Sequence, residues 1–349
     1  MPATSANLGP GFDSLGLALS WHDDVDAWVC PAGLSIEIVG EGAGLAEAGE
    51  EHLVVRAMRA AFDAIGDQPP GIGLRCVNRI PHGRGLGSSA AAIVAGLLAA
   101  RALAAGAPGQ LPDEEVFRLA VGLDGHPDNV AACLAGGLTV AWTAAGGPRL
   151  VRLEPLPWIS PVVCVAPFPV RTDVARGLLP DVVPHRDAAA NAGRSALLVS
   201  SLCCPGGGSA PPGGRPPGIP PILGENLPPQ TPPTPAHGGT ARPSGPSGTM
   251  AVLLDATEDW LHQRYRASAM PETHALLSGL RAAGLPAVVS GAGPSVLVLL
   301  GAREGDDHRQ HLDRLGSIVR ETGMPWHISS LDVERHGARI LRPESPSDC

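Results

Sequence analysis

The stretch Pro81-His-Gly-Arg-Gly-Leu-Gly-Ser-Ser-Ala90 runs into Ser88 to Ala105, a segment rich in Ala, Leu, Ile and Val that is typical of a helix. Because Gly83, Gly85 and Gly87 have no Cβ, their backbone N–H groups can approach an anion closely. The first-turn N–H groups of the helix lack intrahelical partners and lie at its positive dipole end. The stretch therefore predicts a phosphate cradle, with a serine-capped helix after a glycine turn as the alternative.

Two common nucleotide-binding motifs do not match this loop. No lysine follows the glycines, so the loop is not the G-x-x-x-x-G-K-[ST] sequence of P-loop proteins. The glycines also lack the G-x-G-x-x-G spacing of dinucleotide-binding folds. A phosphate cradle at this position would therefore belong to another class.

Composition limits the protein to a few broad classes. Its 349 residues suggest about two domains with a buried core. Hydrophobic residues make up 44% and aromatic residues only 3%, so the core must consist mainly of Ala, Leu and Val. The net charge of −9 argues against a nucleic-acid partner, because no basic stripe is available to displace phosphate counterions.

The cysteines and the apolar segments indicate where such a chain resides. Seven cysteines are scattered without a C-x-x-C pair, which favours a reduced cytoplasmic protein. No basic segment followed by an apolar one opens the sequence, so we expect no signal peptide. The longest uncharged apolar run, residues 90–100, is shorter than the roughly 20 residues of a membrane span. We therefore expect a soluble protein without a membrane partner.

A turn-rich segment, Pro2-Ala-Thr-Ser-Ala-Asn-Leu-Gly-Pro-Gly-Phe-Asp13, opens the sequence. Asn7 offers both a donor and an acceptor, and Asp13 can hold an ammonium group or a hydroxyl. The Gly-Pro-Gly between them would fix the loop that presents both side chains. An Asx-rich turn that caps a helix is the alternative interpretation.

A second polar cluster, Asp124-Gly-His-Pro-Asp-Asn129, follows an expected helix over residues 113–123. A carboxylate such as Asp124 can bind Mg²⁺ through oxygen, and His126 or Asn129 can orient a small polar substrate. The spacing matches no usual zinc ligand set. A polar loop between two helices would explain the same residues without any chemistry.

Two further features lie in the second half of the chain. Arg176 ends Thr172-Asp-Val-Ala-Arg176, and its guanidinium fork matches the geometry of a carboxylate, although a surface ion pair would serve equally well. Ser290-Gly-Ala-Gly-Pro-Ser295 is a second glycine loop. Between them, residues 203–249 are rich in Pro and Gly, which predicts a disordered or polyproline-like insertion. Its Pro-Pro pairs suit an aromatic-lined partner groove, and an inert loop is the alternative.

The remaining pattern mixes strands and helices without a regular βαβ repeat, which favours an α+β fold in two layers. We expect strands over 15–19, 26–30, 34–39, 73–78, 138–142, 162–166, 287–290, 296–300, 327–333 and 338–341. We expect helices over 53–65, 88–105, 113–123, 187–202, 250–265, 271–283 and 308–322, with another beginning at 172.

Four segments now stand in order: PATSANLGPGFD (2–13), PHGRGLGSSA (81–90), GHPDN (125–129) and SGAGPS (290–295). Their order and wording resemble the GHMP small-molecule kinases, and within them the homoserine kinases of threonine biosynthesis. The resemblance covers the chain except for the insertion. It implies a ribosomal-protein-like βα domain over 1–149 that binds ATP and a ferredoxin-like α+β domain over 150–349.

The resemblance also implies roles for individual residues. Asp13, Asp124 and His126 would be the catalytic groups, with Asp13 orienting the substrate rather than abstracting a proton. Mg²⁺ would be held by Ser88 and Asp124. The ATP phosphates would be wrapped by Pro81, Gly83, Arg84, Gly85, Leu86, Gly87, Ser88, Ser89 and Ala90. L-homoserine would lie against Asn7, Asp13, His126, Arg176, Arg266, Gly291 and Gly293, with both arginines on its carboxylate.

Other readings of the resemblance are a GHMP kinase for a mevalonate-type or sugar substrate and a non-catalytic kinase-like binding protein. Such enzymes commonly form homodimers. The chain departs from the family in having Asp124 where glutamate is usual and Arg264 where proline is common. Met1 stands where the family's first strand would end, so we expect either a sheet without that edge strand or a start codon assigned too late.

Overall fold

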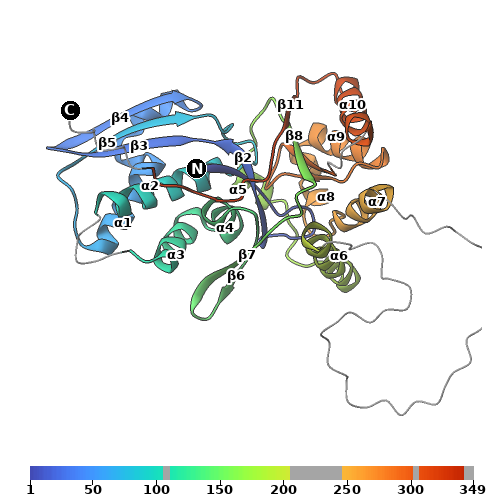
Figure 1. Ribbon diagram of the computed structural model, residues 1–349, viewed down its shortest axis with the longest axis horizontal. Coiled ribbons are helices and arrows are strands. Elements are labelled where there is room, and N and C mark those ends of the chain that lie inside the picture. Colours follow the sequence, from blue (N-terminus) through green and yellow to red (C-terminus); the bar gives the residue numbers. More distant parts are fainter. Residues whose placement is uncertain (105–110, 205–245, 302–305, 342–349) are drawn as a thin grey trace, which may run out of the picture.

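The computed structural model describes residues 1–104, 111–204, 246–301 and 306–341, which build three β-sheets with helices packed against them (Figure 1). The strands and helices confirm the α+β class that the sequence predicts. In Figure 1 the helices α1 to α4 lie beneath the sheet that contains β3, β4 and β5, and the C-terminal helices gather at the opposite end of the molecule.

The central sheet has the strand order β1-β2-β6-β7 and is antiparallel throughout. Its strands are β1 (Pro2–Ala6), β2 (Leu15–His22), β6 (Leu138–Ala144) and β7 (Gly147–Leu153). The predicted turn over 2–13 is therefore wrong for residues 2–6, which form an edge strand among the described residues. They do so because all five are buried and pair with β2.

The second sheet has the order β3-β5-β4 and covers the helices of the N-terminal half. Strands β4 and β5 are parallel, whereas β3 runs antiparallel to β5. Its strands are β3 (Asp24–Cys30), β4 (Gly33–Gly40) and β5 (Gly71–Asn78). The associated helices are η1 (Ala43–Glu51), α1 (Leu53–Ile65), α2 (Ser88–Leu103), α3 (Asp113–Asp124) and α4 (Pro127–Ala135). Helix α2 carries nine buried residues, which places the glycine loop on a rigid, core-packed element.

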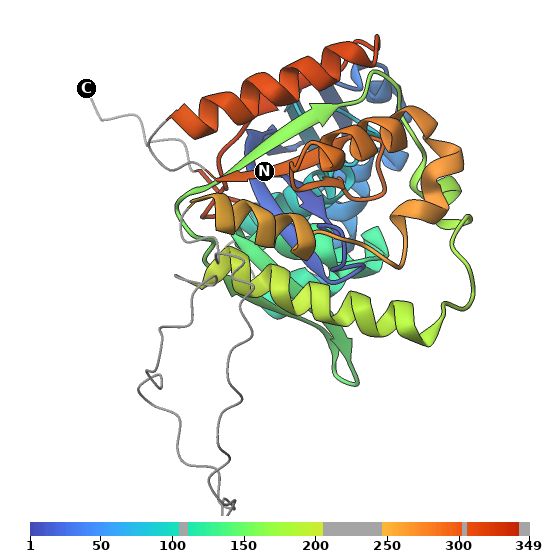
Figure 2. The ribbon, with the colours of Figure 1, turned by 90° about the vertical axis from the view of Figure 1, so that its right-hand side faces the viewer.

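The third sheet has the order β11-β8-β10-β9 and is also antiparallel (Figure 2). Its strands are β8 (Ile159–Val165), β9 (Ala287–Val289), β10 (Val296–Gly301) and β11 (His327–Ser330). Around it lie α6 (His185–Cys203), α7 (Pro246–Ala256), α9 (Pro271–Ala282) and α10 (Asp306–Glu321), with the short α5 (Thr172–Arg176), α8 (Gln263–Arg266) and η2 (Ala267–Ala269). Helices α7, α9 and α10 contact β10 directly.

Strand β7 and the C-terminal segment connect the two expected domains. The expected boundary after residue 149 lies inside β7, whose pairing with β6 continues to Leu153. Near the end of the described chain, Val333 forms a β-bridge with Leu19, and the Gly137 N–H donates to the Glu334 carbonyl at 2.7 Å. Residues from both halves therefore contribute to the packing of the central sheet.

Three predicted elements of the second half differ from the structure. The helix expected over 250–265 is two helices, because the Asp259 carboxylate accepts N–H groups of residues 261–263 and caps a new start. The strand expected over 338–341 does not form. Of the predicted insertion, residues 203 and 246–249 are helix ends, and the rest lies almost entirely outside the described residues.

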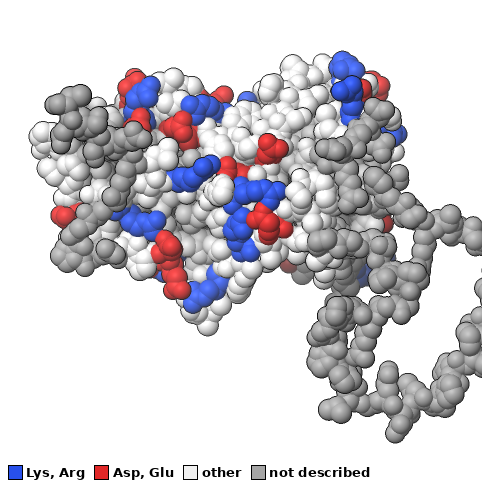
Figure 3. All heavy atoms as spheres, in the orientation of Figure 1, with Lys and Arg blue, Asp and Glu red and all other residues white. Residues whose placement is uncertain are grey.

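The surface carries charges of both signs on the face shown in Figure 3, where arginines and carboxylates are interspersed rather than gathered by sign. All cationic side chains except histidine are arginines, because the chain contains no lysine. Among the helices that the structure describes, none combines the length and apolar character needed to cross a bilayer.

Candidate active site

The glycine loop that precedes α2 forms the centre of the site. Gly83, Gly85 and Gly87 have φ angles of 65°, 73° and 68°, which only glycine adopts without strain. The loop is fixed to β1, since the Thr4 N–H donates to the Leu86 carbonyl at 3.0 Å. The first N–H groups of α2 are therefore held in a fixed position, as a phosphate cradle requires.

The second glycine loop, residues 290–295, packs directly on the first. The Ser290 hydroxyl donates to the Gly85 carbonyl at 2.6 Å. A Cβ at Gly85 would lie 2.2 Å from the Ser290 carbonyl oxygen and 2.8 Å from that of Gly293. Both loops must therefore be glycine-rich for their backbones to come this close.

Arg84, which the sequence placed among the phosphate-binding residues, contacts backbone carbonyls instead. Its Nε donates to the Ala166 carbonyl at 2.8 Å, and its Nη2 donates to that of Pro167 at 3.3 Å. Its Nη1 donates to the His82 carbonyl within the loop at 3.2 Å. The guanidinium thus joins the glycine loop to the end of β8, which gives Arg84 a positioning role in this structure.

Asp124 at the end of α3 lies beside the start of α2. The Ser89 Oγ donates a hydrogen bond to the Asp124 carboxylate at 3.0 Å. The resemblance instead implies that Ser88 and Asp124 act together. Burial raises the pKa of Asp124 to about 6, while the Ser89 hydrogen bond opposes that rise. A carboxylate held this way gains from a cation placed next to it.

Asn7 connects the first and last loops of the site. Its Nδ2 donates to the Gly291 carbonyl at 2.8 Å, and its Oδ1 accepts the Asp13 N–H at 2.9 Å. Asn7 and Asp13 both have positive φ angles, 67° and 53°, which are uncommon for residues other than glycine. Because both ends of the buried Asn7 amide are occupied, Asn7 shapes the loop that presents Asp13.

Asp13 and Arg176, predicted to contact opposite ends of a substrate, contact each other in the structure. Arg176 Nη2 lies 2.6 Å from Asp13 Oδ1, and Nη1 lies 3.1 Å from Oδ2, so the pair is bidentate. The two side chains are 29% and 33% exposed. This ion pair is therefore accessible to a solute, and it brings together residues 163 positions apart.

Arg266 from α8 is a second guanidinium in the same place. It is 1% exposed, and its Nη1 lies 3.1 Å from His262 Nδ1 and 3.3 Å from the Gly291 carbonyl. Among the residues that the structure describes, none accepts a hydrogen bond from its Nε. Both arginines lie near the Phe12 ring, whose centroid is 5.4 Å from the Arg266 guanidinium carbon and 5.5 Å from that of Arg176. Burial and the charge of Arg176 lower the pKa of Arg266 to about 10, so it stays cationic at neutral pH.

His126 caps the start of α4, and Asp128 follows in its first turn. Burial, followed by the charge of Arg176, lowers the pKa of His126, which keeps its imidazole neutral at pH 7. Asp128 is 3% exposed, and burial raises its pKa to about 7. The sequence predicts either a polar loop or a site over residues 124–129. In the structure, the last three of these residues already belong to helix α4, which covers 127–135.

Two family models match parts of the chain, and known proteins match it over its whole length. The families described as GHMP kinases N terminal domain and GHMP kinases C terminal match residues 52–137 and 249–323. A homoserine kinase from Streptomyces coelicolor is 46% identical over 100% of this chain and 95% of its own length. One from Streptomyces avermitilis is 47% identical over 98% and 94%. This chain belongs to the homoserine kinase family of GHMP kinases.

A solved structure agrees with the fold of this kinase. The homoserine kinase from Cytophaga hutchinsonii superposes with a TM-score of 0.74 at 21% identity, covering 97% of this chain and 95% of its own. That likeness supports the two-domain α+β architecture expected from the four sequence segments. GHMP kinases are ATP-dependent kinases, so ATP is the phosphate donor of this chain.

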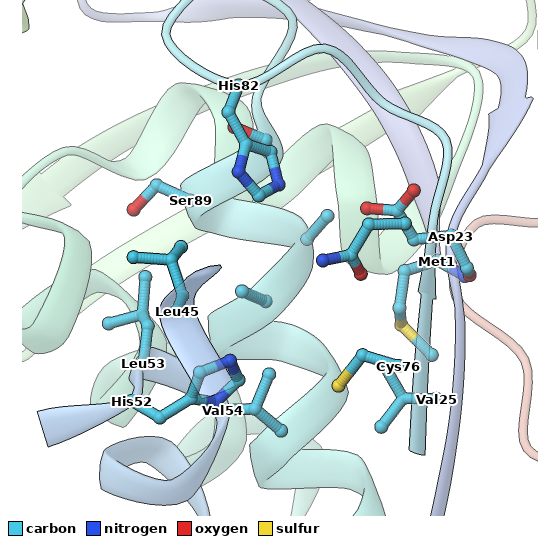
Figure 4. A pocket seen from close by; sticks show the side chains of 14 residues that line it. Met1, Asp23, Val25, Leu45, His52, Leu53, Val54, Cys76, His82 and Ser89 are labelled. Carbon is cyan, nitrogen blue, oxygen red and sulfur yellow. The ribbon is translucent and has the colours of Figure 1, made fainter. Parts of the chain in front are cut away.

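A pocket of about 230 Å³ opens beside the glycine loop and was not predicted from the sequence (Figure 4). His82 and Ser89 lie at one end, with Val25 and Cys76 on one side and Leu53 and Val54 on the other. The other polar residues that line it are Asp23, His52, Asn78 and Ser88. Because it is largely apolar and adjoins the helix start, we propose that it receives the nucleoside of ATP. Of the lining residues, His82, Ser88 and Ser89 belong to the glycine-loop motif. No motif marked the apolar residues, which come from β3, η1, α1, β5, α2 and the start of the chain.

Replacing Asp128 with asparagine is expected to stabilise the kinase more at high pH than at low pH. The folded chain binds the Asp128 proton more tightly than the unfolded chain, whose carboxyl has a pKa near 3.8. The carboxyl therefore costs stability increasingly as the pH rises to about 7, by up to about 4 kcal/mol. Thermal unfolding of D128N should show a gain at pH 8 that largely disappears at pH 4. An equal effect at both pH values would contradict the assigned burial cost.

Proposed function

We propose that this chain transfers the γ-phosphoryl group of ATP to the side-chain hydroxyl of L-homoserine, giving O-phospho-L-homoserine, a step of threonine biosynthesis. The observation that carries the proposal is the convergence of one carboxylate, Asp13, and two guanidinium groups, Arg176 and Arg266, beside the paired glycine loops. An α-amino acid carries the complementary ammonium and carboxylate on a single carbon. The family membership of the chain agrees with this substrate class.

The amino-acid end of the substrate has a matching partner for each charge. The guanidinium forks of Arg176 and Arg266 suit a carboxylate, and Asp13 suits an ammonium group. The loop that carries Asp13 is fixed by Asn7, which is hydrogen-bonded to Gly291 of the opposite loop. Held at these points, homoserine would direct its hydroxyl toward the glycine loop that binds the phosphates.

The phosphate end would be held by backbone N–H groups of the glycine loop and of the first turn of α2. We propose that Ser89 and Asp124 hold Mg²⁺, because their oxygens lie 3.0 Å apart next to that helix start. Two protein oxygens suit Mg²⁺, which usually keeps several waters and phosphate oxygens. Across the described ranges, no group of three or more His, Cys, Asp or Glu side chains could hold a metal ion. When bound, Mg²⁺ neutralises charge on the transferred phosphoryl group.

Positioning accounts for most of the chemistry in this proposal. Phosphoryl transfer passes through a loose transition state, in which alignment and charge neutralisation matter more than a strong base. His126 is neutral at pH 7 because burial lowers its pKa, so it can accept or donate a hydrogen bond to the substrate without carrying charge. Asp13 is held in a bidentate ion pair, which favours an orienting role over proton abstraction.

The alternatives make different demands on the same residues. A sugar has no carboxylate for two arginines, and mevalonate has a carboxylate but no ammonium group for Asp13. A non-catalytic binding protein would have no need of the Ser89–Asp124 contact. These residues therefore favour an amino-acid substrate over either alternative.

The proposal is tested by identifying the product. The purified chain is incubated with ATP, Mg²⁺ and L-homoserine, and the mixture is followed by phosphorus NMR. We expect a phosphomonoester signal with the chemical shift of authentic O-phospho-L-homoserine, growing in equal amounts with ADP. ADP formation without that ester would reject homoserine as the acceptor.

Replacing Arg176 with alanine should raise the KM for homoserine while changing the KM for ATP by less than about twofold. Loss of a bidentate contact to a carboxylate is expected to lower kcat/KM for homoserine by about 100-fold. Arg171 provides a matched control, because it lies in the same segment but is 80% exposed and pairs only with Asp173. R171A should behave like the unmodified chain. Equal damage to both substrates in R176A would remove Arg176 from the carboxylate site.

A further inference from the structure

The ion pair between Asp13 and Arg176 occupies the groups that the proposed substrate would need. Both carboxylate oxygens of Asp13 and both Nη atoms of Arg176 take part, with Nη2–Oδ1 and Nη1–Oδ2 distances of 2.6 and 3.1 Å. Asp13 thus offers Arg176 a carboxylate, as an amino acid would, and Arg176 offers Asp13 a cation in place of the ammonium group. Neither charge can receive a ligand in the same geometry until the pair opens.

We propose that this pair is a resident substitute for the zwitterion, and that an α-amino acid binds by exchange. The substrate carboxylate would replace Asp13 on Arg176, and the substrate ammonium would replace Arg176 on Asp13. This inference rests on the proposed function for the identity of the ligand. It adds that the pair selects ligands carrying both charges, because only those leave no charge without a partner.

The surroundings make the exchange costly for any other ligand. Asp13 and Arg176 are each about one-third exposed, so an opened pair leaves both charges partly desolvated. Arg266 cannot move in to neutralise Asp13, because it is 1% exposed and bound to His262 and Gly291. Arg176 Nε is buried without a partner, so this guanidinium has no other hydrogen bond in the structure to compensate for losing Asp13.

Ligands that carry only one of the two charges show the consequence. γ-Hydroxybutyrate is homoserine without the ammonium group, and 3-aminopropan-1-ol is homoserine without the carboxylate. The acid would take Arg176 and leave Asp13 unpaired next to its own negative charge, and the amine would do the reverse. We call these two compounds half-ligands. Each must break the Asp13–Arg176 pair but can replace only one of its charges, so the pair disfavours both of them relative to homoserine.

The test measures dissociation constants of homoserine and of both half-ligands by ligand-observed NMR, using the full chain. Asp13→Asn frees Arg176, so D13N should bind γ-hydroxybutyrate about five- to tenfold more tightly while binding homoserine more weakly. Arg176→Gln frees Asp13, so R176Q should bind the amino alcohol more tightly by a similar factor. Each removal thus improves one ligand, which loss of folding cannot do.

Asp173→Asn is the matched control, because Asp173 also forms a bidentate pair with an arginine in the same segment but lies away from the site. D173N should leave all three affinities unchanged. Half-ligand affinities that fall or stay constant in D13N and R176Q would overturn the exchange. Turnover of homoserine by the unmodified chain is measured alongside, because its absence would reject the proposed function, whereas its presence without reciprocal tightening rejects only the exchange.

Discussion

The Asp124→Asn variant is expected to lose about 10²- to 10³-fold in kcat, since it removes the carboxylate charge proposed to hold Mg²⁺. Asparagine keeps an oxygen that can accept the Ser89 hydrogen bond now formed at 3.0 Å, so the local structure should survive. The Mg²⁺ concentration that gives half-maximal rate should rise at the same time. Steady-state rates measured over a range of Mg²⁺ concentrations provide both values.

Asp113 is the control for this change, because it begins the same helix α3 but its side chain is 93% exposed. D113N should keep the unmodified Mg²⁺ dependence. Asp124→Glu restores the residue that is usual in the family and should raise the rate if the shorter side chain is unfavourable. A D124N variant with unaltered Mg²⁺ dependence would exclude Asp124 from the metal site.

Substituting alanine for Gly85 should abolish measurable turnover and lower the thermal stability. The new Cβ would lie 2.2 Å from the Ser290 carbonyl oxygen, so the two glycine loops must separate. The φ of 73° adds a conformational cost of about 1 kcal/mol for a residue with a side chain. We expect a loss of at least about 100-fold in kcat/KM for ATP, because the amides proposed to bind the phosphates move with the loop.

Gly66 separates the steric effect from the conformational one. It ends α1 with a φ of 83°, and nothing lies within 4 Å of a Cβ placed there. G66A therefore carries the same backbone cost without a clash and should lower the melting temperature slightly while leaving the kinetics intact. If G85A and G66A behaved alike, contact between the two loops would not be what requires glycine at 85.

Local signals predicted the elements that bear the site. Helix α1 begins and ends at Leu53 and Ile65 as expected from its apolar spacing, and α2 begins at Ser88 as expected from the glycine loop. Strands β2, β3, β4 and β5 were placed correctly but extend further than their alternating patterns suggested. These elements could be predicted because period and capping are properties of neighbouring residues.

The missed elements depend on distant partners. Strand β1 has a sequence of small and polar residues, and it is a strand because Ala3 to Ala6 pair with β2 and are buried beneath other elements. Helix α4 was interpreted as part of a polar loop, although Pro127 at its first position was a usable signal for a helix start. The sequence of strand β7 shows no clear alternation of apolar and polar residues. The strand is defined by its pairing with β6.

In the candidate site, too, local sequence predicts some features and distant partners determine the others. Sequence motifs identified the residues that converge there, but they could not show which of them contact each other. Three contacts follow from tertiary structure: the Asn7 amide bonds to Gly291 and Asp13, Ser89 contacts Asp124, and Asp13 pairs with Arg176. These three contacts change the expected roles of the residues without moving the site.

A site that phosphorylates an amino-acid alcohol should discriminate sharply among acceptors. ATP turnover by the purified chain is measured with L-homoserine, mevalonate and galactose as separate acceptors, each with and without Mg²⁺. We predict Mg²⁺-dependent turnover with L-homoserine alone. Turnover with mevalonate or galactose in place of homoserine would rule out an amino-acid alcohol as the acceptor. So would the absence of turnover with all three in a folded chain that binds ATP.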